Sequence, residues 1–145
     1  MIIKLKNFII KLYIYDTAGT ELYQSISTNY YRRSFASLIV FDLCKEENLK
    51  ELENWINYYK ENRDNNKIEL IYLIGNKVDL DNREIQEEDI SDLMKKNKIK
   101  NYYEVSAKTG KNVDELFKRV LQDLIQFYLI DGGYEKLINI NIVLQ

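Results

Sequence analysis

Short apolar runs alternate along this chain with segments in which apolar residues recur every three or four positions. The short runs are rich in β-branched and aromatic residues, which favours strands, and the recurrent pattern is typical of amphipathic helices. The helical pattern is clearest after Asn112, which together with Glu115 resembles a capping box at a helix start. We expect strands over residues 2–5, 8–15, 37–43, 68–74 and 102–105, and helices over 46–62, 87–96 and from 112 onward.

The order of these elements predicts a mostly parallel sheet. From the third strand onward, strands alternate with helices, and this alternation places helices on both faces of a parallel sheet. The first two strands are too close for a helical crossover, so we expect them to pair through a tight turn near Lys6 and Asn7. We expect the fourth strand to end at Gly75. Because parallel sheets bind ligands at the carboxyl ends of their strands, the loops that follow the strands are where chemistry is expected.

The last segment of the chain has a strand-like pattern of its own. Ile138, Ile140 and Ile142 alternate with polar residues, and this alternation follows the glycine pair Gly132 and Gly133. The sequence assigns this segment no pairing partner and no role.

Composition narrows the range of possible functions. The 145 residues fit one domain, and 46% apolar with 30% charged residues is typical of a globular protein. A net charge of −2 gives no basic field that would attract nucleic acid. The chain has no histidine, which excludes His-based acid–base catalysis and most zinc sites. The single cysteine, Cys44, ends an apolar run, so we expect a packed, inert thiol in a reducing, intracellular protein.

The loop after the fourth strand carries the first candidate site. It contains Asn76, Lys77 and Asp79. A carboxylate accepts two parallel hydrogen bonds, and guanine offers two adjacent donors on one edge, whereas adenine does not. Asp79 is therefore a candidate for reading guanine, Asn76 for bracing the loop, and the Lys77 stem for covering the base. The alternative is an ordinary polar turn in which Asn and Asp have no ligand.

Two more loops fit the same kind of site. Ser106, Ala107 and Lys108 follow the fifth strand, where a short residue lets a backbone N–H approach a base oxygen. Asp16 ends the second strand, where a carboxylate can hold Mg²⁺ through water, and Gly19 leaves a backbone N–H accessible to a phosphate. Taken alone, the loop of residues 106–108 is also compatible with a simple connection to the final helix. The loop of residues 16–19, taken alone, is also compatible with an ordinary Asp–Gly turn.

Together, the three motifs DTAG (16–19), NKVD (76–79) and SAK (106–108) resemble those of Ras-superfamily small GTPases. The stretch 23–32, with Tyr30, Tyr31 and Arg32, resembles the switch II helix of the Rab branch. The resemblance covers residues 8–125 and implies an α/β, Ras-like fold of the P-loop NTPase type. It divides the chain into a small-GTPase domain, 1–127, and a C-terminal extension, 128–145, of unknown role.

The resemblance also implies a role for each motif. GTP or GDP with Mg²⁺ would be the ligand, and effector and regulator proteins would bind at switch II. At least one of the switch II tyrosines is alternatively a core residue. The implied roles are guanine binding for Asn76, Lys77, Asp79, Ser106, Ala107 and Lys108, phosphate sensing for Gly19, Mg²⁺ support for Asp16, and partner binding for Tyr23, Tyr30 and Tyr31.

Three features depart from the family pattern. No G-x-x-x-x-G-K-[ST] phosphate loop occurs, which predicts weak phosphate binding. The first strand, first helix and switch I are also missing, so we expect unpaired edges in the middle of the sheet. Thr20 stands where the family has a water-orienting glutamine, which predicts slow hydrolysis and leaves enzymatic activity open.

The sequence thus supports more than one hypothesis about function. The first is an incomplete Rab-like, guanine-nucleotide-dependent switch in vesicle traffic. The second is a non-enzymatic pseudo-GTPase that binds partners through switch II, and the third is a product that does not fold stably. We expect a cytoplasmic monomer without a prenylation site, since no cysteine follows Cys44.

Overall fold

The computed structural model describes residues 2–5, 8–17, 29–64, 70–130 and 137–144. It contains six strands and three long helices in these ranges. In chain order they are β1 (Ile2–Leu5), β2 (Phe8–Asp16), β3 (Ala36–Asp42), α2 (Asn48–Asn62), β4 (Leu70–Asn76), α3 (Glu87–Asn97), β5 (Asn101–Glu104), α4 (Val113–Ile130) and β6 (Leu137–Leu144).

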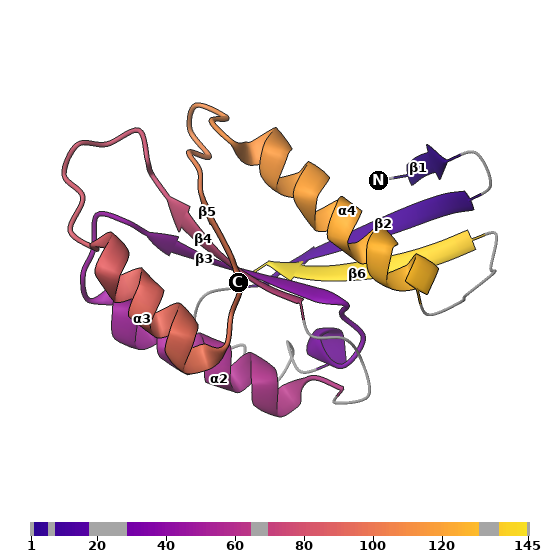
Figure 1. The fold of residues 1–145 in the computed structure, drawn as a ribbon, viewed down its shortest axis with the longest axis horizontal. Coiled ribbons are helices and arrows are strands. Elements are labelled where there is room, and N and C mark those ends of the chain that lie inside the picture. The colour runs from indigo at the N-terminus through magenta and orange to yellow at the C-terminus, as the bar shows by residue number, and fades with distance from the viewer. Residues whose placement is uncertain (1, 6–7, 18–28, 65–69, 131–136, 145) are drawn as a thin grey trace.

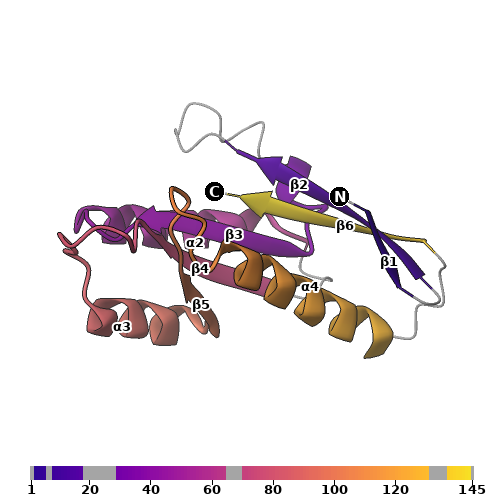
Figure 2. The same ribbon diagram turned by 90° about the horizontal axis from the view of Figure 1, so that it is seen from above.

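The strands form one sheet in the order β1-β2-β6-β3-β4-β5. β1 and β2 are antiparallel, and every other neighbouring pair is parallel. Helices α2 and α3 cover one face of the sheet and α4 covers the other (Figures 1 and 2). This arrangement confirms the predicted α/β, Ras-like sheet with helices on both faces.

The C-terminal strand β6 lies in the middle of the sheet. It pairs in parallel with β2 from Ile9–Leu137 to Asp16–Leu144, and with β3 from Ala36–Ile142 to Leu38–Leu144. Figure 1 shows it, in yellow, between these two strands. The prediction of unpaired central edges is therefore wrong, because the C-terminal segment supplies a strand there. Its alternating isoleucines were predicted as a strand, but pairing with residues more than a hundred positions away leaves no local pattern.

One apolar layer holds α4 against the sheet. Tyr72 in β4 is fully buried there and donates its hydroxyl to Asp123 Oδ2 at 2.7 Å. The bond gives a buried polar group its partner, and it fixes the helix across the strand. The buried residues of this layer are Leu12, Ala36, Leu38, Leu70, Tyr72, Ile74, Val105, Leu116, Val120 and Leu124.

The opposite layer packs α2 and α3 on the sheet, and it includes Tyr31. The Tyr31 side chain is 0% exposed, and its ring lies edge-on to those of Tyr58 and Tyr59 at centroid distances of 5.7 and 5.8 Å. Tyr31 was predicted to belong to the partner surface, and that prediction is wrong. Burying the Tyr31 ring removes a large apolar area from water, which favours a position in the core over an exposed one.

One local prediction also differs from the structure. β4 continues through Gly75 to Asn76, because Gly75 pairs with Phe41 on one side and Glu104 on the other. A Cβ at Gly75 would lie 2.9 Å from both the Leu43 Cδ2 and the Tyr102 hydroxyl, so glycine serves close packing and does not end the strand.

Asn112 stands at the start of α4, where its carbonyl accepts the Leu116 N–H at 3.0 Å. Asn112 has a positive φ of 62° and donates its amide to the Glu104 carbonyl at 2.8 Å. The start of α4 is thereby tied to the end of β5.

In the described part of the chain, no helix is long and apolar enough to cross a bilayer.

Candidate functional site

The carboxyl ends of β2, β3, β4 and β5 lie along one edge of the sheet. Because these strands are parallel, each one delivers its following loop to the same side. The sheet pairing aligns Asp42 of β3 with Asn76 of β4, and Gly75 with Glu104 of β5. This edge therefore brings the NKVD and SAK motifs next to each other.

Two hydrogen bonds join these loops. The backbone N–H of Ala107 donates to the side-chain oxygen of Asn76 at 3.0 Å, and the N–H of Val78 donates to the Val105 carbonyl at 3.1 Å. Asn76 therefore braces the second loop with its own side chain. The two motifs form one unit, although Asp79 and Ser106 are 27 positions apart in the sequence (106 − 79).

Asp79 is held next to the second loop in its charged form. A hydrogen bond from the Ser106 hydroxyl lowers the Asp79 pKa, and the nearby charges of Lys108 and Lys77 lower it further. Ser106 is 0% exposed, and its Oγ also accepts the N–H of Thr109 at 3.1 Å. The Ser106 hydroxyl, held by the Thr109 N–H, thus keeps the Asp79 carboxylate ionised beside the SAK loop.

Lys77 adopts a backbone conformation that is unusual for a lysine. Its φ is +70°, and its ammonium lies 2.6 Å from Asp42 Oδ2. This ion pair raises the Lys77 pKa. The contact anchors the ammonium at the end of β3 and leaves the stem of a half-exposed side chain along the loop.

Asp42 is a site residue that sequence reasoning missed. It accepts the Cys44 N–H at 2.9 Å as well as the Lys77 ammonium. Burial raises the Asp42 pKa, but the two hydrogen bonds and the charges of Lys77 and Lys45 outweigh it and leave the pKa low. An aspartate at the carboxyl end of a buried parallel strand was the signal that could have revealed it.

The predicted packing of Cys44 is confirmed. Its side chain is 9% exposed, and burial raises the thiol pKa, assisted by the nearby Asp42 carboxylate. A raised pKa keeps the thiol protonated at neutral pH, which is the inert form.

The phosphate side of the predicted site is only partly described. Asp16 ends β2, where its side chain is exposed. Gly19, Thr20 and Tyr23 lie outside the described residues, so their roles stay predictions. Within the described residues, no group of three or more acidic or cysteine side chains is placed to hold a metal ion. The Mg²⁺ role of Asp16 stays a prediction.

Tyr30 keeps the exposure expected of a partner-binding residue. Its side chain is 38% exposed, and its ring lies 4.6 Å from that of Tyr15. Tyr15 in β2 thus packs against the Tyr30 ring. The two neighbouring tyrosines of this motif therefore differ, since Tyr31 is in the core.

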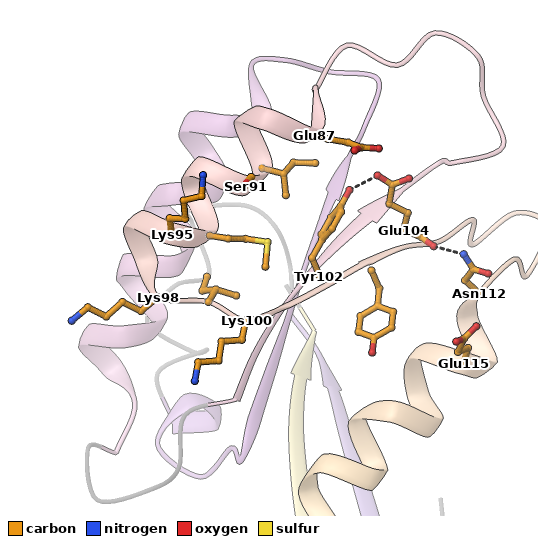
Figure 3. A pocket seen from close by; sticks show the side chains of 13 residues that line it. Glu87, Ser91, Lys95, Lys98, Lys100, Tyr102, Glu104, Asn112 and Glu115 are labelled. Atoms are coloured by element: carbon orange, nitrogen blue, oxygen red, sulfur yellow. Dashed lines mark hydrogen bonds between the residues drawn. The ribbon is translucent and has the colours of Figure 1, made fainter.

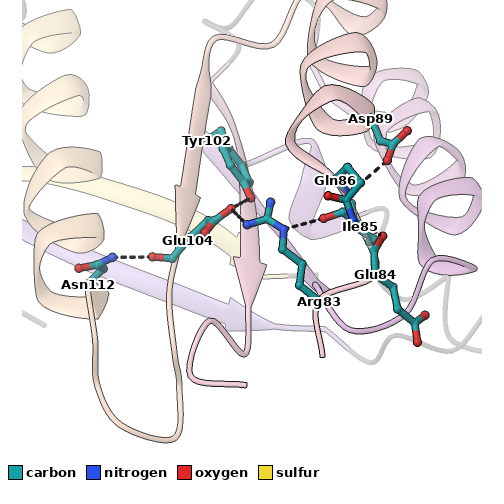
Figure 4. Close-up of polar contacts among 8 residues, drawn as sticks. All are labelled: Arg83, Glu84, Ile85, Gln86, Asp89, Tyr102, Glu104 and Asn112. Carbon is teal, nitrogen blue, oxygen red and sulfur yellow. Dashed lines mark hydrogen bonds and ion pairs between the residues drawn. The ribbon is translucent and has the colours of Figure 1, made fainter. Parts of the chain in front are cut away.

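A polar network supports the two loops from the edge of the sheet (Figure 4). Arg83 Nη1 lies 2.9 Å from Glu104 Oε1, and the Tyr102 hydroxyl donates to the same oxygen at 2.6 Å. Arg83 Nε also donates to the Ile85 carbonyl at 2.6 Å. Burial, followed by the bond to Glu104, raises the Tyr102 pKa. The network ties the segment after β4 to the end of β5, next to the loop that bears Asp79.

The motifs and their geometry agree with the comparisons with known proteins. A model of the Ras family matches residues 1–126. The chain belongs to the Ras family. Three similar proteins are of the Rab branch: a putative Ras-related protein Rab-5B from Dictyostelium discoideum is 37% identical over 122 residues, and the Ras-related proteins Rab-13 and Rab-27B from Bos taurus are 35% identical over 133 and 40% over 126.

These relatives are longer than the chain. The matched regions cover 84%, 91% and 83% of the chain, but 56%, 62% and 54% of the Rab-5B, Rab-13 and Rab-27B proteins. The chain therefore spans a little over half the length of these Rab proteins.

Proposed function

We propose that this Rab-branch chain binds guanine nucleotides and that Asp79 selects the base. The observation that carries the proposal is the joint placement of the NKVD and SAK loops, in which the Ala107 N–H bonds the Asn76 side chain and the Ser106 hydroxyl lowers the pKa of Asp79. The family membership of the chain supports the same ligand.

Base selection follows from the charge state of Asp79. A carboxylate with a lowered pKa is ionised at neutral pH and only accepts hydrogen bonds. Guanine presents its ring N–H and its amino group side by side, so both carboxylate oxygens are used. Adenine presents no such pair and would leave the carboxylate unsatisfied, which makes the discrimination steep.

The phosphates contribute less to the proposed binding than the base does. The sequence has no G-x-x-x-x-G-K-[ST] loop, whose N–H groups and lysine would hold them. Asp16 at the end of β2 is the described carboxylate positioned to support Mg²⁺ through water. We therefore propose that the 145-residue chain binds guanosine, GMP, GDP and GTP with similar affinity, and that Mg²⁺ changes this affinity little.

The cellular role we propose is that of a Rab-like switch protein in vesicle traffic. Support comes from the Rab-branch relatives and from exposed Tyr30, which offers an aromatic ring within the switch II stretch. Effector and regulator proteins would be the partners at this surface.

The base-selection proposal is tested by calorimetric titration of the 145-residue chain with GDP, GMP and ADP, with and without Mg²⁺. We expect GDP and GMP to bind and ADP to bind far more weakly. Asp79→Asn should weaken GDP by about 10- to 100-fold, since it replaces an ionic acceptor by an amide. The same variant should gain xanthosine diphosphate, because the xanthine carbonyl accepts from the new amide.

The matched control is Asp81→Asn, which removes a carboxylate from an exposed position in the same loop. It should leave GDP affinity unchanged. Equal binding of ADP and GDP, or unaltered GDP binding by Asp79→Asn, would contradict base selection by Asp79.

A further inference from the structure

The outer edge of β5 borders a large groove on the side of the sheet away from β2. The groove has a volume of about 890 Å³ and runs between α3 and the start of α4 (Figure 3). Ile90 and Met94 of α3, Tyr102 and Tyr103 of β5, and Asn112 line it. β5 is the last strand of the sheet order, and none of the described strands pairs with this edge.

The backbone of β5 can accept another strand. In a parallel pair, alternate residues direct their N–H and C=O groups to opposite sides. The Val105 N–H donates to the Gly75 carbonyl at 2.8 Å. The backbone N–H and C=O groups of odd-numbered residues in β5 therefore point to β4, and those of even-numbered residues point to the groove. Tyr102, at the centre of β5, therefore presents both backbone groups to the groove, and Asn112 already bonds the Glu104 carbonyl there.

Charges of opposite sign gather at the two ends of the groove. Lys95, Lys98 and Lys100 line one end and lie on the left of Figure 3. Asp92 pairs with Lys95 at 3.2 Å, which leaves that end with a net charge of +2 (3 − 1).

The other end of the groove is acidic. Glu87, Glu104 and Glu115 line it and lie on the right of Figure 3. Arg83 offsets Glu104, which leaves this end with a net charge of −2 (3 − 1). Because β5 runs between the basic and the acidic end, an identical strand laid antiparallel to it presents the complementary charges.

We propose that this edge binds a second copy of the chain through antiparallel β5–β5 pairing about a two-fold axis at Tyr102. In that register the two Tyr102 residues exchange their N–H and C=O groups. Lys100 of each copy then lies directly opposite Glu104 of the other, since 100 and 104 are equidistant from 102. The Lys100 ammonium joins Arg83 at the Glu104 carboxylate, and the backbone hydrogen bonds are confined to the Tyr102 pair, because Asn112 holds the Glu104 carbonyl. Opposite charges at directly facing positions stabilise a strand pair.

The charge pattern of this edge favours pairing with a second copy of the chain over protection against such association. Edge strands that are guarded against association carry charges, often lysines, that repel a second copy. Here the charges are segregated by sign, so an antiparallel copy is attracted at both ends. This dimer replaces the monomer expected from the sequence, and it does not depend on nucleotide binding.

Sedimentation equilibrium of the whole chain, from about 1 µM to about 200 µM, tests the proposal. We expect a reversible dimer with a dissociation constant in the micromolar range, as is usual for a small interface. Salt at about 1 M should weaken it, because exposed charge pairs are screened. Lys100→Glu should weaken it by about tenfold or more, since two like-charge pairs replace two attractive ones.

The matched control is Lys100→Arg, which keeps the charge and should dimerise like the unmodified chain. Lys100 is exposed and precedes β5, and circular dichroism verifies that both variants are folded. A monomer throughout this range would overturn the proposal, including one that binds an extended peptide of another protein at the same edge. A dimer that Lys100→Glu leaves intact would overturn it too.

Discussion

At the scale of single residues, Asp42 links the base-recognition loop to the sheet. It receives the Lys77 ammonium at 2.6 Å and the Cys44 N–H at 2.9 Å. With these two partners, the Asp42 carboxylate at the end of β3 stabilises the folded state only when it is ionised. The stability of the protein should therefore depend on pH through this residue.

Asp42→Asn should lower the free energy of unfolding by about 1 kcal/mol at pH 7, a modest value because Lys77 is half exposed. The folded-state pKa of Asp42 lies below its ordinary value, so its contribution is complete above about pH 4 and is lost as the pH falls through the folded-state pKa. Urea titrations followed by Trp55 fluorescence at several pH values measure the difference.

The comparison for Asp42 is Asp92→Asn, which breaks a surface pair whose carboxylate is 68% exposed. It should change stability by less than about 0.5 kcal/mol at any pH. A stability gap between Asp42→Asn and the unmodified chain that stays constant down to pH 2 would show that the carboxylate charge is not the cause.

Residue identity predicted the candidate site well where the residue type itself limits the chemistry. The sequence singled out Asn76, Asp79 and Ser106, and the structure brings them together. It did not separate Tyr30 from Tyr31, since neighbouring tyrosines on a short helical turn have the same local pattern. Only the position of α2 decides which ring is covered.

At the scale of elements, the end of α3 shows a residue in a conformation that it does not favour. Lys98 ends the helix in the left-handed region, with φ 58° and ψ 30°. Its N–H bonds the Lys95 carbonyl at 3.2 Å, which satisfies one of the last acceptors of the helix. The neighbouring Lys60 ammonium donates to the Asn97 carbonyl at 2.8 Å and holds this helix end against α2.

Lys98→Gly should therefore stabilise the chain relative to Lys98→Ala by about 1 kcal/mol, because a Cβ is strained in the left-handed region. Both variants lose the same charge and side chain, so their difference isolates the Cβ. Urea unfolding at a concentration well below the dissociation constant of the proposed dimer measures it. Equal stability of the two variants would mean that the helix ends differently in solution.

At the scale of the whole molecule, β6 decides whether the sheet is continuous. It joins β2 to β3, so both lose a neighbour if it is displaced. Val143 pairs with Tyr15 on one side and Ser37 on the other. A neighbouring strand is therefore present to accept the Val143 N–H, whichever side it points to.

Val143→Pro should destabilise the protein by about 3 kcal/mol or more, because proline removes a ladder donor and clashes inside a sheet. Val143→Ile retains the N–H and the β-branch, and it should cost less than about 1.5 kcal/mol. Thermal unfolding monitored by circular dichroism compares the two. If both variants melt together with the unmodified chain, β6 does not pair as described.

The sequence by itself determined the elements, the parallel character of the sheet and the residues of the base-recognition loops. Those features depend on local periodicity and on residue chemistry, which can be recognised within about ten to twenty consecutive positions. Tertiary structure alone decided that β6 fills the centre of the sheet, that Asp42 anchors Lys77 and that Tyr31 is buried. Each of these depends on contacts between distant segments, and their free energy is set by which surfaces meet, not by any short stretch of sequence.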